Sequence, residues 1–123
     1  MSQYTLPDNI PGLDMPTALG RLRGNHKLYG KLLVQMRDEL SKLHEKISEA
    51  LSTGNFHDLA MHAHTIKGMT GNLGANDLQN AAAQLETAVK QQSDISVIFT
   101  QLDNYEKVHN ILVEALAALV PPQ

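Results

Sequence analysis

Apolar residues recur along most of the chain at alternating spacings of three and four, which is the period of an amphipathic α-helix. The longest such stripe runs from Leu33 to Ala50 and is typical of a helix that packs one face against a bundle core. No stretch shows a strand pattern. The pattern predicts four long helices: one from Asn25 to Gly54, one from Asn55 to Gly74, one that begins near Asn76, and one that begins at Ser93 or Asp94 and stops at Pro121-Pro122.

The segment before these helices has a different character. Residues 1–12 show no sustained period and contain two prolines, so they are predicted to be a tail or linker. Asp14 is placed to cap a short helix, which Gly24 ends. We therefore expect one domain over residues 13–120 and a short tail at 121–123. The predicted fold is all-α, an antiparallel up-down-up-down four-helix bundle with the short extra N-terminal helix over one end.

Composition narrows the choice of partner and location. Ten Lys and Arg residues against thirteen Asp and Glu give a net charge of −3, which does not favour nucleic acid as a ligand. The absence of cysteine excludes a disulfide framework and a thiolate metal site. No apolar run approaches the ~20 residues that cross a bilayer, and the N-terminus lacks the features of a secretory signal. We expect a soluble, cytoplasmic chain that makes no membrane contact and has a protein partner.

The second long helix contains an unusual group of side chains. His64 is followed by Lys67, Gly68 and Gly71, and glycine inside a helix costs about 1 kcal/mol relative to alanine. At ~100° per residue, His64 points about 140° away from Leu59, the reference position of the apolar stripe. Both glycines fall on the side of the histidine. The helix is therefore expected to bare one imidazole on a flat surface, with an ammonium group one turn away.

An exposed imidazole of this kind suits in-line attack on a phosphoryl group that another protein holds. The attack needs a neutral ring nitrogen with a free lone pair, and the ordinary histidine pKa of ~6.5 leaves most rings neutral near pH 7. The ammonium of Lys67 can pair with phosphoryl oxygens, although a solvated pair is worth only ~1 kcal/mol. Because the sequence has no nucleotide-cradling loop, the phosphoryl donor and any metal ion must come from the partner.

The same residues resemble the signature of histidine-containing phosphotransfer domains, the phosphorelay modules of two-component signalling. The family pattern is a His, a variable residue, a hydrophobic residue, Lys and Gly, followed by a small residue and Leu-Gly. The expected helices extend the similarity over residues 13–119. The matching residues are, in order, His64, Ile66, Lys67, Gly68, Gly71, Leu73 and Gly74.

The resemblance implies that His64 is a phosphohistidine. It would accept a phosphoryl group from an aspartyl phosphate on a response-regulator receiver domain and pass it to the Asp of another receiver. Such a domain is a phosphoryl carrier rather than an enzyme, has no cofactor or metal of its own, relies on Mg²⁺ in the receiver, and can act as a monomer. Segments between Pro11 and Leu33 also look like the opening of such domains at the C-terminus of hybrid sensor histidine kinases. That similarity implies a larger parent kinase anchored in the inner membrane.

The partner is expected to dock on the exposed face around His64. Ala60, Gly68 and Gly71 are expected contacts because they are the smallest neighbours of the imidazole, and Lys67 borders the same surface. His57 and Glu86 are expected at the rim of this docking surface. A close helix crossing does not explain Gly68, since this residue points away from the apolar stripe.

Glu86, on the third long helix, falls on the shoulder that leans toward His64. Many members of the resembled family have a Gln near this position that hydrogen-bonds the histidine. A carboxylate can orient an imidazole N–H, but it also repels phosphoryl oxygens. Two roles stay open for Glu86: it orients the ring, or it is an ordinary solvated side chain.

The histidines also allow other interpretations. In one alternative, His64 receives phosphate directly from a kinase ATP-binding domain, as in chemotaxis kinases. In another, His64 is an incidental surface residue and the chain is a plain helical interaction module. A metal site is disfavoured, because His62 and His64 point about 200° apart and His57 lies roughly 10 Å from His64 along the helix. His109 is expected to pack inside the bundle, and His44 has no assigned role.

Overall fold

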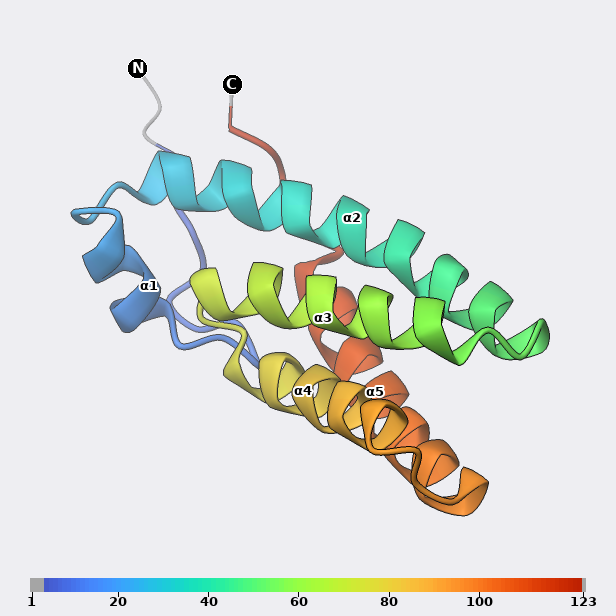
Figure 1. Ribbon diagram of the computed structural model, residues 1–123. Coiled ribbons are helices and arrows are strands. Elements are labelled where there is room, and N and C mark those ends of the chain that lie inside the picture. The colour runs from blue at the N-terminus through green and yellow to red at the C-terminus, as the bar shows by residue number, and fades with distance from the viewer. Residues whose placement is uncertain (1–3, 123) are drawn as a thin grey trace.

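The computed structural model describes residues 4–122 and is all-α. Four long helices run antiparallel as a bundle, and a short helix lies over the end where the first of them begins (Figure 1). This arrangement confirms the predicted fold. None of the helices in the described part of the chain is long and apolar enough to cross a membrane. The helices are α1 (Met15–Arg21), α2 (His26–Ser52), α3 (Phe56–Asn72), α4 (Asn76–Lys90) and α5 (Ile95–Leu116).

Helix ends follow the predicted capping residues in most places. Asp14, Asn25 and Asn55 each accept a hydrogen bond from the backbone N–H three residues later, at 3.4, 3.0 and 3.0 Å. Asp94, one of the two predicted starts, occupies the N-cap position of α5, although its side chain makes no capping hydrogen bond. The last helix ends at Leu116, which is several residues before the prolines that were predicted to stop it.

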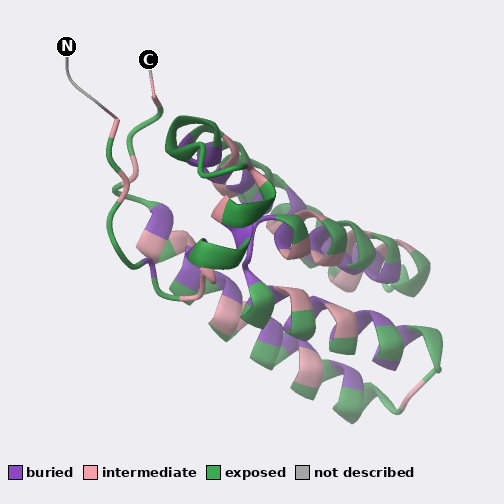
Figure 2. Cartoon of the chain, turned by 90° about the vertical axis from the view of Figure 1, so that its left-hand side faces the viewer, coloured by how far each residue is buried: buried purple, intermediate pink, exposed green. Residues whose placement is uncertain are grey.

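The core forms where the apolar stripes of the helices meet. In α3, the predicted stripe of Leu59, Ala63, Ile66 and Thr70 is fully buried. The Thr70 hydroxyl donates to the Ile66 carbonyl at 2.7 Å, so this polar group is satisfied inside the core. Figure 2 shows the buried faces turned toward the interior of the bundle. Helix α3 packs against both α2 and α4. A side chain on its outer face can therefore reach solvent and still lie beside a neighbouring helix.

The turn between α3 and α4 fixes how these two helices face each other. Gly74 has a left-handed φ of +82°, as predicted for a residue that ends a helix. Its carbonyl accepts from the Asp14 backbone N–H at 2.8 Å, and the Tyr29 hydroxyl donates to the Leu73 carbonyl at 2.8 Å. These bonds tie the turn from which α4 starts to the beginning of α1 and to α2.

Part of the predicted tail is packed on the bundle. Ile10 is 3% exposed and belongs to the core. The hydroxyl of Tyr4 donates to the Val120 carbonyl at 3.0 Å, and its ring lies against Gly30, where a larger residue would collide with it. Residues 4–12 therefore differ from the predicted tail or linker, while residues 1–3 and 123 lie outside the described chain.

Candidate functional site

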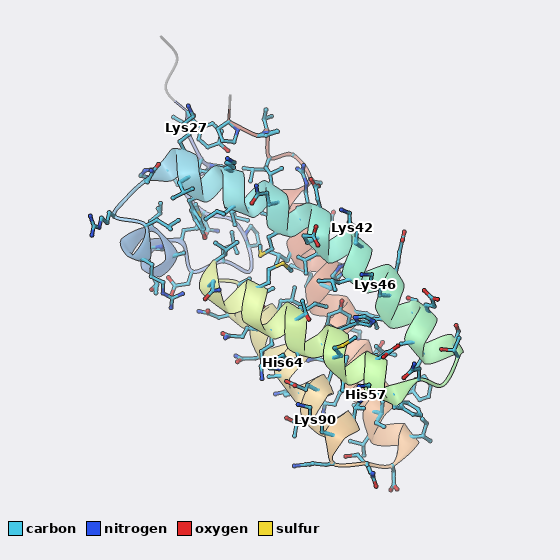
Figure 3. All side chains as sticks on the ribbon, turned by 45° about the horizontal axis from the view of Figure 1, so that its top comes forward. Lys27, Lys42, Lys46, His57, His64 and Lys90 are labelled. Atoms are coloured by element: carbon cyan, nitrogen blue, oxygen red, sulfur yellow. The ribbon has the colours of Figure 1, made fainter. Side chains whose placement is uncertain are left out.

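His64 lies on the outer face of α3, on the side that faces α4. Its side chain is 63% exposed, whereas the neighbouring Ala63 is fully buried. Figure 3 shows His64, His57 and Lys90 on one side of the molecule, away from the lysines of α2. The structure thus confirms that the helix presents this imidazole to solvent.

The imidazole is held by a buried carboxylate. The side chain of Glu86 is only 5% exposed, and its Oε2 atom lies 2.9 Å from His64 Nδ1. Lys90 Nζ contacts the same oxygen at 2.8 Å, and Lys67 Nζ contacts Oε1 at 2.9 Å. The alternative of an ordinary solvated Glu86 is therefore wrong. We call these four residues the Glu86 cluster.

The cluster keeps Glu86 ionised. Burial by itself raises the pKa of this carboxyl group, but hydrogen bonds from Lys90, Lys67 and His64 outweigh burial and lower the pKa to about 2. An ionised carboxylate can only accept hydrogen bonds, so the Nδ1 atom of His64 must carry the hydrogen in their contact. In the neutral ring this leaves Nε2 unprotonated, with its lone pair free. Glu86 therefore selects which ring nitrogen of His64 keeps a free lone pair.

Lys90 is the member of the cluster that sequence reasoning missed. It lies on α4, four residues after Glu86, which is a spacing that brings two helical side chains together. That spacing was a usable signal, but surface pairs of this kind are common and their value is small. What distinguishes the pair is that Glu86 is buried and also holds His64.

A groove runs beside the Glu86 cluster, where α3, α4 and α5 meet at one end of the bundle. Its volume is about 770 Å³. Three apolar side chains in its wall are substantially exposed: Phe56 at 36%, Met61 at 49% and Ile95 at 53%. Of the predicted docking residues, the groove includes His57, Ala60 and Glu86. Ala60 is 6% exposed, so it forms the floor of the groove and not the exposed contact that was predicted.

The two glycines after His64 lie outside the groove and differ from each other. A β-carbon on Gly68 would meet nothing within 4 Å in the described chain, in agreement with a surface that is open at this position. A β-carbon on Gly71 would collide with the side chain of Gln79 on α4. Gly71 therefore leaves room for a side chain of the neighbouring helix, and its expected role in docking stays a prediction.

The other histidines do not join the site. No group of three or more His, Asp or Glu side chains among residues 4–122 is placed to hold a metal ion. His109 is 5% exposed and packed in the bundle, as predicted, and burial lowers its pKa. Its ring stacks on that of His44 with 4.4 Å between centroids, and Tyr105 lies beside both. His44 thus has a packing role that the sequence did not indicate. We call these three residues the histidine stack.

The fold and the exposed histidine define a class of helical bundles that present one imidazole to a partner. The family model of the Hpt domain matches residues 31–119. Among solved structures, the chain is similar to the HPT domain of the Hpt sensor hybrid histidine kinase from Shewanella, with 23% identity and a TM-score of 0.66 over 88% of this chain and 96% of that one. A comparison with curated proteins found no match.

The chain therefore belongs to the Hpt domain family. Hpt domains carry phosphoryl groups in two-component phosphorelays and interact with receiver domains, and they are carriers rather than catalysts.

Proposed function

We propose that His64 accepts a phosphoryl group from the aspartyl phosphate of a receiver domain and passes it to the Asp of a downstream response regulator. The observation that carries this proposal is the contact between an exposed imidazole and a buried, ionised carboxylate. It leaves Nε2 of His64 as the free nucleophile on the solvent side. The open surface at Gly68 and the neighbouring groove support access by another protein.

The transfer step follows from this geometry. The Nε2 lone pair attacks phosphorus, a P–N bond forms, and the P–O bond to the donor Asp breaks so that its carboxylate leaves with the electron pair. The phosphorylated ring keeps its proton at Nδ1, where Glu86 accepts the hydrogen bond and offsets the positive charge. Lys67 is placed to interact with the phosphoryl oxygens. We expect Mg²⁺ to be supplied by the receiver domain, and we assign no cofactor to this chain.

The groove is the surface that we propose for receiver docking. Its exposed apolar side chains, Phe56, Met61 and Ile95, can be buried by an apolar face of the partner, and they lie beside His64. His57 lies in the same groove as a polar rim contact. On the resemblance of the segment before Leu33, we further propose that the domain belongs to a membrane-anchored hybrid sensor histidine kinase and acts in the cytoplasm.

Phosphoryl labelling tests the site directly. A receiver domain carrying a radioactive aspartyl phosphate should transfer acid-labile label to the wild-type chain and none to His64→Gln. His62→Gln, which removes a histidine from the same helix but outside the Glu86 cluster, should be labelled like the wild type. Label retained in His64→Gln would overturn the assignment. Label that arrives only from a kinase ATP-binding domain, and not from any receiver, would overturn the proposed donor.

A further inference from the structure

The Glu86 cluster contains one more positive charge than a single carboxylate can balance. Lys67 and Lys90 both contact Glu86, one at each carboxylate oxygen, at 2.9 and 2.8 Å. Lys90 shares its oxygen with His64, so its ammonium lies at most two hydrogen-bond lengths from the imidazole Nδ1 atom. The cluster therefore holds a second ammonium group close to the imidazole ring that is to be phosphorylated.

The two lysines differ in freedom and in position. The side chain of Lys90 is 63% exposed, against 35% for Lys67. Lys90 also lines the groove where we place the receiver. Its flexible stem can move the ammonium group over several ångströms without disturbing the core. Lys90 is thus the cation that can follow a phosphoryl group on the groove side of the ring.

We infer that Lys90 is a second cationic contact of the phosphoryl group, and that its ammonium moves from Glu86 to the phosphoryl oxygens when His64 is phosphorylated. This inference rests on the proposed phosphorylation of His64. A protein-bound phosphoryl group carries close to two negative charges near neutral pH and offers three acceptor oxygens. Glu86 keeps its hydrogen bond with the ring when Lys90 leaves, so the carboxylate is not stranded without a partner.

The charges around the ring support this exchange. From α3, the groups near the groove and the cluster are His57 and Lys67, and from α4 they are Glu86 and Lys90. In the described chain, the residues that α5 and the preceding loop contribute to the groove are uncharged. After phosphorylation, the new anion therefore lies near two ammonium groups and one carboxylate that is already bonded to the imidazole.

The expected effects are modest, because Lys90 is exposed to solvent. Lys90→Gln should shift the equilibrium between phosphohistidine and receiver phosphoaspartate toward the receiver by about two- to fivefold. It should also raise the pH at which the phosphoryl group titrates, since a nearby ammonium favours the dianion. Lys90→Arg keeps the charge and should behave like the wild type. Lys107→Gln is the matched control, because Lys107 also pairs with an acidic residue four positions earlier on an exposed helix, at 3.1 Å.

The deciding experiment is ³¹P NMR titration of the phosphorylated chain in these four forms. The protein is phosphorylated with phosphoramidate, so that the reagent's P–N bond breaks, ammonia leaves and a P–N bond to His64 forms without a receiver. We expect the phosphoryl titration to move to higher pH in Lys90→Gln alone, and the Nζ resonance of Lys90 to move on phosphorylation of the wild type.

Two failures are distinguishable in this design. A Lys90→Gln titration that matches the wild type and Lys107→Gln, or a Nζ resonance that does not respond, overturns the role of Lys90 while leaving the phosphorelay function intact. A chain that takes phosphate from phosphoramidate but from no receiver overturns the proposed function, and the titration still decides the role of Lys90.

Discussion

The Glu86 cluster and the histidine stack show two ways in which one bundle uses the same residue type. His64 is 63% exposed on its helix and is held by a buried carboxylate, whereas His109 is 5% exposed and packs against another histidine. In the first case, an ionised carboxylate that also binds two lysines lies beside a largely exposed ring. In the second, burial lowers the pKa of the ring and so favours its neutral form, and the Nδ1 atom lies 3.1 Å from the Asn110 side-chain oxygen. The surroundings of the ring, and not the imidazole itself, separate the histidine that we propose to be reactive from the one that packs in the core.

Of the substitutions that test this difference between the two sites, removal of the Glu86 carboxylate should change stability most. Because the pKa of Glu86 is lowered from 4.5 to about 2 on folding, its ionised form stabilises the native state fully above pH 4.5, and this stabilisation is lost as the pH falls toward 2. The contribution is about 3 kcal/mol at most. Urea unfolding of the wild type between pH 6 and 3 should show this loss, and Glu86→Gln should lack it.

A control glutamate makes the test of Glu86 specific. Glu114 is an exposed residue of α5, so Glu114→Gln should keep the pH dependence of the wild type. Equal pH dependence in the wild type and Glu86→Gln would contradict the ionised, buried state of Glu86. Glu86→Ala should slow receiver-dependent labelling of His64, because it removes the acceptor that fixes the hydrogen on Nδ1, whereas the amide oxygen of Glu86→Gln can still accept from this atom.

Burial of His109 in the histidine stack should make stability depend on pH in a higher pH range than Glu86 does. The lowered pKa of buried His109 means that the unfolded chain binds a proton below pH ~6.5 before the folded chain does. Stability should therefore fall as the pH drops from 7.5 to 5.5, by up to about 1.4 kcal/mol per pH unit below 6.5. His109→Leu should flatten this part of the unfolding curve. His26→Gln, at the exposed start of α2, should not; a slope that survives in His109→Leu would contradict the account.

The smallest effect should come from Gly68, where stability and function are expected to move in opposite directions. Gly68→Ala meets no described neighbour within 4 Å and should stabilise the helix by about 0.5–1 kcal/mol. If a receiver needs this open surface, labelling of His64 should become slower. Gly71→Ala should gain less stability than Gly68→Ala, because the terminal amide of Gln79 must first move aside. Thermal unfolding measures the change in stability, and receiver-dependent labelling measures the change in function. Faster or unchanged labelling in Gly68→Ala would contradict a place for Gly68 in the docking surface.

Much of this architecture could be predicted because it depends on local rules. The three-four spacing of apolar residues defined the helices, and Asn25 and Asn55 marked two of their starts through bonds to residues only three positions away. The exposed His64 also followed from the projection of a single helix. These features need no knowledge of how one helix lies against another.

The features that were missed depend on contacts between helices. Projection of α4 alone placed Glu86 on a shoulder, but its burial is decided by the register of α4 against α3. The collision expected at Gly71 likewise involves Gln79 on a different helix, and the stacking of His44 on His109 joins α2 to α5. A correct helical period does not determine how deeply the residues beside the apolar stripe are buried. A small rotation of the helix about its axis buries those on one side of the stripe and exposes those on the other.

The position of the phosphoryl group on the ring tests the central claim most directly. The chain, labelled with ¹⁵N-histidine, would be phosphorylated by a receiver aspartyl phosphate and examined by ³¹P and ¹⁵N NMR. The Glu86 contact at Nδ1 predicts a single P–N bond at Nε2 of His64, with the hydrogen kept on Nδ1. A phosphoryl group on Nδ1, or on any other residue, would contradict the account.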